Sequence, residues 1–436
     1  MSPRGARARR ANGKKYATWL AAGVVVLGGT AVTAVAASAG GEGAGPGDGT
    51  RAAKAHALAL DGKDPKRRAL PRTGTPTFSL VGVSWEDSGD TFEGTAQIRT
   101  REAATGEWSE WHDLDFAIRA PESTEGEEPD VRGASEPLWV GPSDGVEARV
   151  VADGEETAIP EALRLDMIDP GETVKGRGNG KGDGGIKGSG KGDAEPPTSG
   201  APTDPAPGAV TAQEPTGPAA ATIPTAPTAP TAPTAPAVVS RAGWGADESL
   251  VQDPPSYLNK VDAVFVHHTA GTNDYTCADS PAVIRAILTY HVRTNGWNDV
   301  GYNFFVDKCG TVFEGRAGGV ERPVLGAHTY GFNSYSSGIS LLGDYENGGT
   351  PTAAAQQAVA DLAAWKLGLH GVDPEAEVAL TAAADTGVWK KGQVATLNTI
   401  SGHRDGYATL CPGASLYSAL PGIRTTAGAS PYATGN

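Results

Sequence analysis

The chain has 436 residues, enough for two or three domains, and it contains 60 glycines and 32 prolines. These counts exceed average usage, so the excess must lie in flexible or low-complexity segments, which argues against a single compact domain. The formal net charge of −15 argues against a nucleic-acid partner, because phosphates would be repelled. Three cysteines are too few for a disulfide scaffold. All three, and six of the eight histidines, follow residue 260, so we expect the chemistry there.

The first 39 residues have the order of a secretory signal peptide. Six basic side chains precede an uncharged run over residues 16–41, which contains the small-residue cleavage site Ala37-Ser38-Ala39. We therefore expect residues 1–39 to be removed and the mature protein to be secreted, with no stable membrane partner. The alternative is an uncleaved anchor, because the run is long enough to span a bilayer. Export also permits a disulfide.

The next part of the chain is predicted to change from disorder to β structure. Residues 40–74 are polar, lack apolar periodicity and are expected to be disordered. Residues 75–170 show short segments in which apolar and polar residues alternate, separated by Gly, Asp and Pro. These segments predict a small all-β domain, an antiparallel sandwich of about six strands.

The tryptophans of this β-rich domain allow two interpretations. Flat indole rings could stack on sugar faces, or they could fill a thin β core. No catalytic grouping accompanies them, so the role of the domain stays open. The four residues are Trp85, Trp108, Trp111 and Trp139.

A linker separates this domain from a third part with ordinary globular composition. Residues 171–237 alternate Gly with charged residues and then repeat Thr-Ala-Pro, so they are expected to be a disordered linker. Residues 238–425 mix strands and helices, which predicts an α/β domain whose mixed β-sheet is flanked by helices; residues 426–436 form a tail. The predicted elements are a strand over 261–266, a helix over 281–292, a hairpin of 302–306 and 311–314, a strand over 339–342 and a helix over 352–369.

Two imidazoles and one thiol of this domain suggest a metal site. The pair His267-His268 follows a predicted buried strand, and His403 lies eight residues before Cys411 in a segment bounded by Gly and Pro. A His-His pair alone is more often structural. Together, however, two imidazoles and a thiolate are typical of catalytic zinc sites, which leave the fourth position for water. Such a zinc ion keeps a net charge of +1, so it can still acidify water and polarise a carbonyl.

Five separated motifs resemble the peptidoglycan recognition protein family and occur in its order. The resemblance covers under half of the chain. Catalytic members of the family are zinc-dependent N-acetylmuramoyl-L-alanine amidases, so it implies the amidase fold, a Zn²⁺ cofactor and a peptidoglycan or muropeptide partner at the cell wall. The exported layout with a β-rich first half is similar to actinobacterial members. The motifs are residues 266–269, 301–304, 326–329, 339–343 and 402–413.

The resemblance implies roles for single residues. The zinc ligands of the family correspond to His267, His403 and Cys411, and its catalytic tyrosine corresponds to Tyr302. A phenol in that place can donate a hydrogen bond to the developing oxyanion. Thr409, two residues before Cys411, stands where some relatives carry lysine. It cannot supply a positive charge, so we expect it to orient groups of the catalytic site.

Three further residues match family positions that contact the muramyl peptide: Thr269, His291 and His328. For His291 the alternative is a structural role on its helix. Arg404 and Asp405 are expected to form a structural ion pair. No charged general base of the usual Glu kind is evident in the motifs, so the sequence does not assign the proton shuttle.

The cysteine assignment depends on the resemblance. If Cys411 binds zinc, Cys277 and Cys309 remain as the natural disulfide pair. Two free thiols are the alternative, and a bond from Cys411 to either of the others would abolish the zinc site.

The sequence therefore leads to a secreted, cell-wall-associated, monomeric zinc amidase that cleaves between the muramic acid lactyl group and L-alanine. The alternative is a non-catalytic peptidoglycan-binding sensor on the same fold, which the presence of all three ligands and Tyr302 disfavours. A structural surface protein held by an uncleaved anchor is a third hypothesis.

Overall fold

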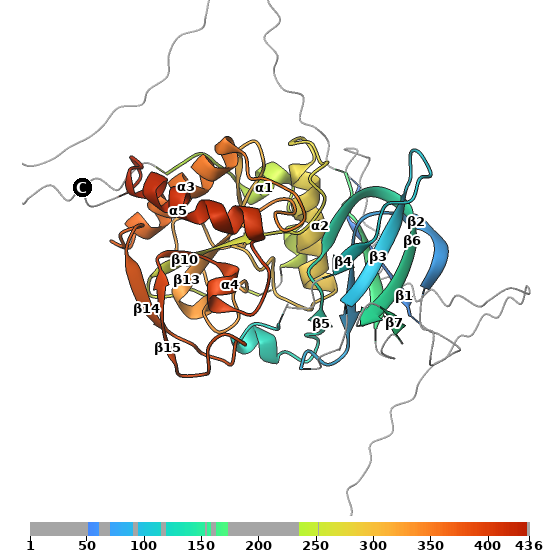
Figure 1. Cartoon of the computed structure of the whole chain (residues 1–436), viewed down its shortest axis with the longest axis horizontal. Helices are drawn as coiled ribbons and strands as arrows, with labels where there is room; N and C mark the ends of the chain where they lie inside the picture. Colours follow the sequence, from blue (N-terminus) through green and yellow to red (C-terminus); the bar gives the residue numbers. More distant parts are fainter. Residues whose placement is uncertain are drawn as a thin grey trace, which may run out of the picture.

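The computed structural model describes residues 51–60, 70–89, 95–114, 119–152, 155–157, 163–172, 235–251 and 253–433. The predicted signal peptide, most of the predicted linker and the end of the predicted tail lie outside these ranges. Among the described residues, no helix combines the length and the apolar character that crossing a bilayer requires. A β-rich part and a mixed α/β part lie side by side (Figure 1).

The β-rich part is one antiparallel sheet in the order β1-β8-β2-β6-β3-β4, with β5 beside β2 and β7 beside β6. In β3 the side chains of Ala96, Ile98 and Thr100 are buried and those between them are partly exposed, so the predicted period of two is confirmed there. The elements are β1 (Lys54–Ala59), β2 (Leu70–Trp85), β3 (Thr95–Glu102), β4 (His112–Leu114), the 3₁₀ helix η1 (Thr124–Glu127), β5 (Gly133–Ala134), β6 (Leu138–Ala152), β7 (Glu155–Thr157) and β8 (Arg164–Asp169).

This part differs from the sequence prediction in two ways. Residues 54–59 and 70–74 belong to strands, not to a disordered segment, because β1 pairs along its whole length with β8 and β2 begins against β6. The strands also join into one hydrogen-bonded sheet, whereas a sandwich has two. The long strands β2 and β6 pair with register shifts, and such irregularities let strands bend.

The four tryptophans occupy two kinds of surroundings. Trp85 and Trp139 are buried, which favours the core interpretation for both. Trp108 and Trp111 lie under the guanidinium group of Arg99, at 5.8 Å and 4.8 Å from their ring centroids. A ring face that packs against a guanidinium group is not free to stack on a sugar.

The α/β part contains a mixed six-stranded sheet in the order β16-β10-β13-β11-β12-β9 and a separate β14–β15 hairpin. Strands β16, β10, β13 and β11 are mutually parallel, while β11 and β12 form the predicted antiparallel hairpin. The elements are β9 (Val238–Val239), α1 (Arg241–Trp244), η2 (Glu248–Leu250), β10 (Ala263–His268), α2 (Ser280–Arg293), β11 (Phe304–Val306), β12 (Val312–Glu314), η3 (Asn333–Tyr335), β13 (Ser336–Leu341), α3 (Ala353–Gly368), β14 (Glu377–Thr381), β15 (Val394–Asn398), β16 (Ile400–Gly402), α4 (His403–Gly406) and α5 (Ala414–Gly428).

The predicted helices are confirmed as α2 and α3. Thr352 is the N-cap residue of α3, and its hydroxyl oxygen accepts a hydrogen bond from the amide of Ala355 at 3.1 Å. Such a bond satisfies one of the amides that a helix start leaves without a partner. Apolar residues of α3 and α5 pack on one face of the sheet. They bury apolar side chains of β10, β11 and β13 on that face.

Strand β10, which lies between β16 and β13, carries the buried run that the sequence predicts. All six of its residues are buried, because β13 and β16 pair with its two edges and side chains cover both faces. Its two neighbours are parallel to it, so the carboxyl ends of all three strands meet at the same edge of the sheet. In open sheets with parallel strands, functional sites form at that edge.

Helix α2 joins the two parts of the molecule (Figure 1). Its apolar face contributes Ile284 and Ile287 to a cluster that includes Leu80 of the β-rich sheet. The Tyr290 hydroxyl lies 3.1 Å from the carbonyl oxygen of Val83. A Cβ atom at Gly82 would approach the Tyr290 hydroxyl to 2.3 Å, so this close packing needs glycine. The two parts thus share an apolar core.

Candidate metal centre

The parallel strands bring two of the predicted ligands together. His267 stands near the end of β10, and His403 directly follows β16, in which Gly402 pairs with Val266. The two imidazole ring centroids are therefore only 4.5 Å apart. Both side chains are buried, with exposed fractions of 0% and 7%.

Cys411 completes the group from the turn between α4 and α5. Its sulfur lies 3.7 Å from Nδ1 of His267. One ligand atom from each of His267, His403 and Cys411 lies within 4.8 Å of the others. The structure thus places the three predicted ligands, which are up to 144 residues apart in sequence, around one point.

The donor set fits zinc. Ligand atoms at about 2.0 Å for nitrogen and about 2.3 Å for sulfur in a tetrahedral site lie about 3.5 Å apart, close to the observed Nδ1–Sγ distance of 3.7 Å. Nδ1 of His403 is buried and has no hydrogen-bond partner among the described residues, although buried polar atoms normally have one. The amide of His268 donates a hydrogen bond to the Cys411 sulfur at 3.4 Å, which favours the thiolate.

Burial keeps the histidines in the form that binds metals. Desolvation lowers the pKa of His403 to about 3, and it lowers the pKa of His267 well below its usual value. Both imidazoles are therefore neutral at pH 7, as a metal ligand must be. At the other ring nitrogen of His267, Nε2 lies 3.2 Å from Nδ1 of His328 and 3.4 Å from the Thr329 hydroxyl. These contacts fix the orientation of the His267 ring.

Tyr302 lies beside this group. Its ring centroid is 5.1 Å from that of His267 and 6.0 Å from that of His291, and its side chain lines the same cavity as His291, His328 and His403. The hydroxyl lies 3.3 Å and 3.4 Å from the two carboxylate oxygens of Glu136. The structure therefore places Tyr302 beside the candidate metal ligands and next to a carboxylate of the β-rich part.

His291 and His328 also face the cavity. Nδ1 of His291 accepts a hydrogen bond from the amide of Gly301, one residue before Tyr302, so the structural alternative for His291 describes part of its role. The Nε2 atoms of both histidines are buried without a hydrogen-bond partner among the described residues. Desolvation lowers the pKa of each to about 3, so both are neutral at pH 7. Because Nδ1 of neutral His291 accepts a hydrogen bond, its Nε2 carries the proton and can donate to a bound ligand.

The two predicted threonines bind backbone groups. The Thr269 hydroxyl accepts a hydrogen bond from the amide of Gly343 at 3.0 Å, and the Thr409 hydroxyl accepts one from the amide of Cys411 at 3.1 Å. The first joins the end of β10 to the segment after β13. The second lies in the turn that carries the Cys411 sulfur, and an orienting role for Thr409 stays a prediction.

The expected ion pair between Arg404 and Asp405 is replaced by other contacts. Arg404 pairs with Glu346 at 3.3 Å. Asp405 accepts hydrogen bonds from the amide of Gly402 at 2.8 Å and from the Tyr417 hydroxyl at 2.6 Å. Asp405 therefore anchors the start of α4, and with it the backbone of His403.

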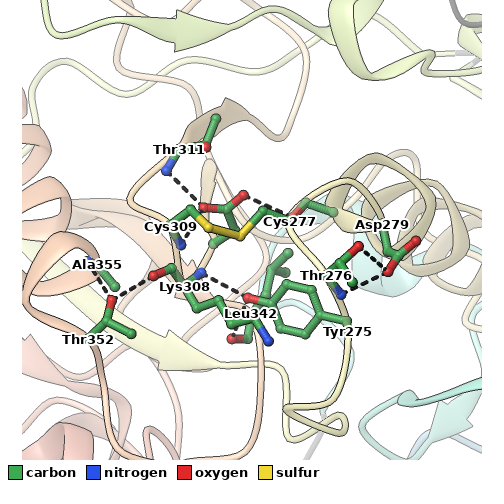
Figure 2. The surroundings of a disulfide bond; sticks show 12 residues. Tyr275, Thr276, Cys277, Asp279, Lys308, Cys309, Thr311, Leu342, Thr352 and Ala355 are labelled. Atoms are coloured by element: carbon green, nitrogen blue, oxygen red, sulfur yellow. Dashed lines mark hydrogen bonds between the residues drawn. A yellow bond between two sulfur atoms is a disulfide. The ribbon is translucent and has the colours of Figure 1, made fainter.

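Cys277 and Cys309 form a disulfide, with Cα atoms 6.3 Å apart (Figure 2). The bond joins the segment before α2 to the turn of the β11–β12 hairpin, and the carboxylate of Asp307 accepts hydrogen bonds from the amides of Cys309 and Thr311 in that turn. Cys277, Asp307 and Cys309 also lie close enough together to hold a metal ion. Because the two sulfurs are bonded to each other, this second group does not compete for the metal.

Replacement of both Cys277 and Cys309 by serine is expected to lower the free energy of unfolding by about 3 kcal/mol, because the unfolded chain loses a loop constraint spanning 32 residues. Chemical denaturation of wild type and the double variant measures the difference. Zinc content is expected to stay unchanged. A double variant that is folded, as shown by a cooperative unfolding transition, but binds no zinc would show that the disulfide supports the metal centre directly.

The sequence reasoning missed several residues that line the cavity. Those from the β-rich part carry no motif, because only the folded chain brings them near the metal centre. Trp297 lies in a loop of the α/β part and Asn333 begins η3, both of them between the predicted motifs. The missed residues are Arg119, Pro121, Glu136, Trp297, Tyr330, Asn333 and Tyr407.

Comparison with known proteins agrees with this geometry. Residues 257–414 match the family described as N-acetylmuramoyl-L-alanine amidase, and residues 46–170 match the family described as Rv3811 N-terminal galactose-binding domain-like. These matches support peptidoglycan binding or amidase activity. Peptidoglycan-recognition protein SC1a/b of Drosophila simulans is 32% identical over 185 residues, which are 42% of this chain and 84% of that relative.

A mammalian relative and a solved structure extend the comparison. Peptidoglycan recognition protein 1 of Bos indicus is 34% identical over 42% of this chain and 82% of that relative. The structure of wild-type PGRP-LB from Drosophila is 26% identical, covers 42% of this chain and 92% of that chain, and has a TM-score of 0.33. On the extent of the sequence matches, the chain belongs to the peptidoglycan recognition protein family, as its motifs predict.

Proposed function

We propose that the protein is an exported, zinc-dependent N-acetylmuramoyl-L-alanine amidase that acts on peptidoglycan. The observation that carries the proposal is the convergence of His267, His403 and Cys411 around one point. The ring of Tyr302 lies beside that of His267, and Tyr302 and His403 line the same cavity. Zinc at this site would supply Lewis-acid polarisation of a carbonyl and a water of lowered pKa.

The residues of the chain have separate tasks in this reaction. The Tyr302 phenol donates a hydrogen bond to the lactyl oxygen, which gains negative charge when water attacks the amide carbon. The bond between the lactyl carbonyl carbon and the nitrogen of L-alanine then breaks, and the peptide leaves as an amine. His328 holds the ring of His267, while Thr409 and Asp405 hold the backbone of Cys411 and His403.

The layout of the chain fits action outside the cell. The amino-terminal residues 1–39 direct export and are removed, residues 171–237 link the β-rich domain to the amidase domain of residues 238–425, and the mature protein works as a monomer at the cell wall. A disulfide in the α/β part is consistent with an oxidising compartment.

Digestion of purified peptidoglycan tests the proposal. The zinc-loaded protein is expected to release peptides with a new amino-terminal L-alanine, detected by amine labelling and mass spectrometry, while sugar reducing ends do not increase. Exhaustive chelation is expected to stop the release, and added zinc to restore it. Peptide release that is unaffected by chelation would contradict the zinc mechanism, whereas binding without release would support the sensor alternative.

A further inference from the structure

A segment of the β-rich part reaches across to the metal centre. Residues 119–136, which we call the strap, lie between β4 and β6 and include η1 and β5. In Figure 1 this teal segment extends from the β-rich sheet towards the side of the α/β part that carries α4. Arg119, Pro121 and Glu136 of the strap line the cavity that contains His403.

The first anchor of the strap is Glu122. Its carboxylate accepts hydrogen bonds from the amide and the side-chain nitrogen of Asn333, at 3.0 Å and 2.7 Å. The side-chain oxygen of Asn333 accepts hydrogen bonds from the amides of His328 and Thr329. The strap is thus bound to the loop that orients the ring of His267.

The second anchor is Glu125, on η1. Its carboxylate forms an ion pair with Arg316 at 2.5 Å and accepts a hydrogen bond from the amide of Asn298 at 2.9 Å. The Glu125 and Arg316 side chains are 9% and 7% exposed. Removing one member of a buried ion pair is costly, because the other charge stays buried without its partner.

Close packing holds the strap between these anchors. Val131 belongs to an apolar cluster with Trp297 and Ala327. A Cβ atom at Gly296 would lie 2.3 Å from the carbonyl oxygen of Asp130, so the strap approaches the α/β part as closely as a glycine allows. The contact is therefore complementary in shape as well as in charge.

The third anchor lies in the metal centre itself. The carboxylate of Glu136 takes the hydrogen bond of the Tyr302 hydroxyl. The same hydroxyl is the group that the reaction needs for the oxygen of the scissile amide. Glu136 therefore occupies the place of a substrate oxygen.

The space left under the strap is too small for a substrate. The cavity between the strap and the metal centre measures about 20 Å³, room for about one water molecule. Sites for small organic ligands have volumes of about 300–1,000 Å³, and a muramyl peptide is large among such ligands. A substrate can enter only if the strap leaves.

We propose that the strap is an intramolecular inhibitor of the metal centre. It covers the cavity lined by Tyr302 and His403, which we call the muropeptide groove, and the protein binds substrate only after the strap has been displaced. This inference rests on the proposed function, since the covered site is the amidase site. The apparent affinity for a muropeptide is then the intrinsic affinity multiplied by the fraction of molecules with an open groove. Weakening an anchor raises that fraction.

Single substitutions in the full chain test this inference. Glu125→Ala removes the ionic anchor, and Glu122→Ala removes the carboxylate anchor that binds Asn333, without changing a metal ligand. Glu127→Ala is the matched control, because it removes the same charge from an exposed position of η1. Peptide release from a soluble muramyl pentapeptide is measured on zinc-loaded proteins, and pentapeptide binding is measured by calorimetry on zinc-free proteins, which do not consume it.

Glu125→Ala and Glu122→Ala are each expected to raise the rate of peptide release at low substrate concentration. Each is also expected to tighten pentapeptide binding by about tenfold or more, which corresponds to about 1.4 kcal/mol of lost docking energy of the strap. Glu127→Ala is expected to behave as the wild type. Hydrogen exchange within residues 119–136 is expected to speed up only in the two anchor variants. If Glu125→Ala does not fold, Glu122→Ala decides alone.

The outcomes separate this inference from the proposed function. Wild-type rates and affinities in folded, zinc-loaded anchor variants overturn the strap as an inhibitor, even if the protein is an amidase. Lower rates in the anchor variants also overturn it, because they would show that the strap assists the reaction. Tighter binding without release by any variant supports the strap and contradicts the amidase.

Discussion

Replacement of Cys411 by serine is expected to reduce zinc affinity by more than about a hundredfold. Loss of a residue that only hydrogen-bonds a metal ligand typically costs about 10–100-fold, and loss of the ligand itself costs more. The sulfur is the only anionic donor of the predicted set, and the amide of His268 supports its charge. A serine hydroxyl stays protonated at neutral pH and is a much weaker ligand. Zinc content after dialysis against a competing chelator measures the effect, and peptide release is expected to fall with it.

The double variant that lacks Cys277 and Cys309 is the control for the loss of sulfur. It is expected to keep its full zinc content while it loses stability. Equal zinc affinity in wild type and the Cys411 variant would contradict the ligand assignment. Thermal unfolding with and without zinc gives an independent check, because a metal that binds only the folded state raises its stability.

Replacement of Tyr302 by phenylalanine is expected to lower kcat by about 10²–10³-fold, the usual effect of removing one hydrogen-bond donor to an oxyanion. Zinc content is expected to stay at the wild-type level, because the phenol is not a ligand. KM is not expected to rise, since the variant also loses the hydroxyl that holds Glu136 of the strap. Steady-state kinetics on a soluble muramyl peptide separates the two parameters.

Tyr257→Phe is the control for this substitution. Tyr257 is 38% exposed and its hydroxyl contacts Gly318 and Arg322, so the variant removes a phenol hydroxyl from the protein surface. It is expected to keep wild-type kcat. A Tyr302→Phe enzyme with wild-type kcat would mean that another group stabilises the oxyanion, and the role of Tyr302 would then be wrong.

The parts of the fold that were predictable are those with a local cause. The buried run of β10, the capped helix α3 and the hairpin around Cys309 follow from short patterns. Helix α5 was missed, and it contains Pro421, which normally argues against a helix interior. Strand β1 was missed because its pairing partner β8 lies more than a hundred residues away.

The candidate site shows the same division. The predicted ligands could be found because each lies in a motif at the end of a strand or in a bounded turn. Glu136 could not, because it reaches Tyr302 across 166 residues of sequence through the docking of two domains. Contacts of this kind depend on how surfaces fit each other, which no local spacing encodes. The carboxylate that contacts Tyr302 thus comes from the domain whose role the sequence left open.

The central claim is that two imidazoles and one thiolate hold a zinc ion with one position left for water or substrate. X-ray absorption at the zinc edge tests it directly on the zinc-loaded protein. The expected result is one zinc ion per chain with one sulfur neighbour at about 2.3 Å and nitrogen or oxygen neighbours at about 2.0 Å. A spectrum without a sulfur neighbour, or with two, would contradict the account.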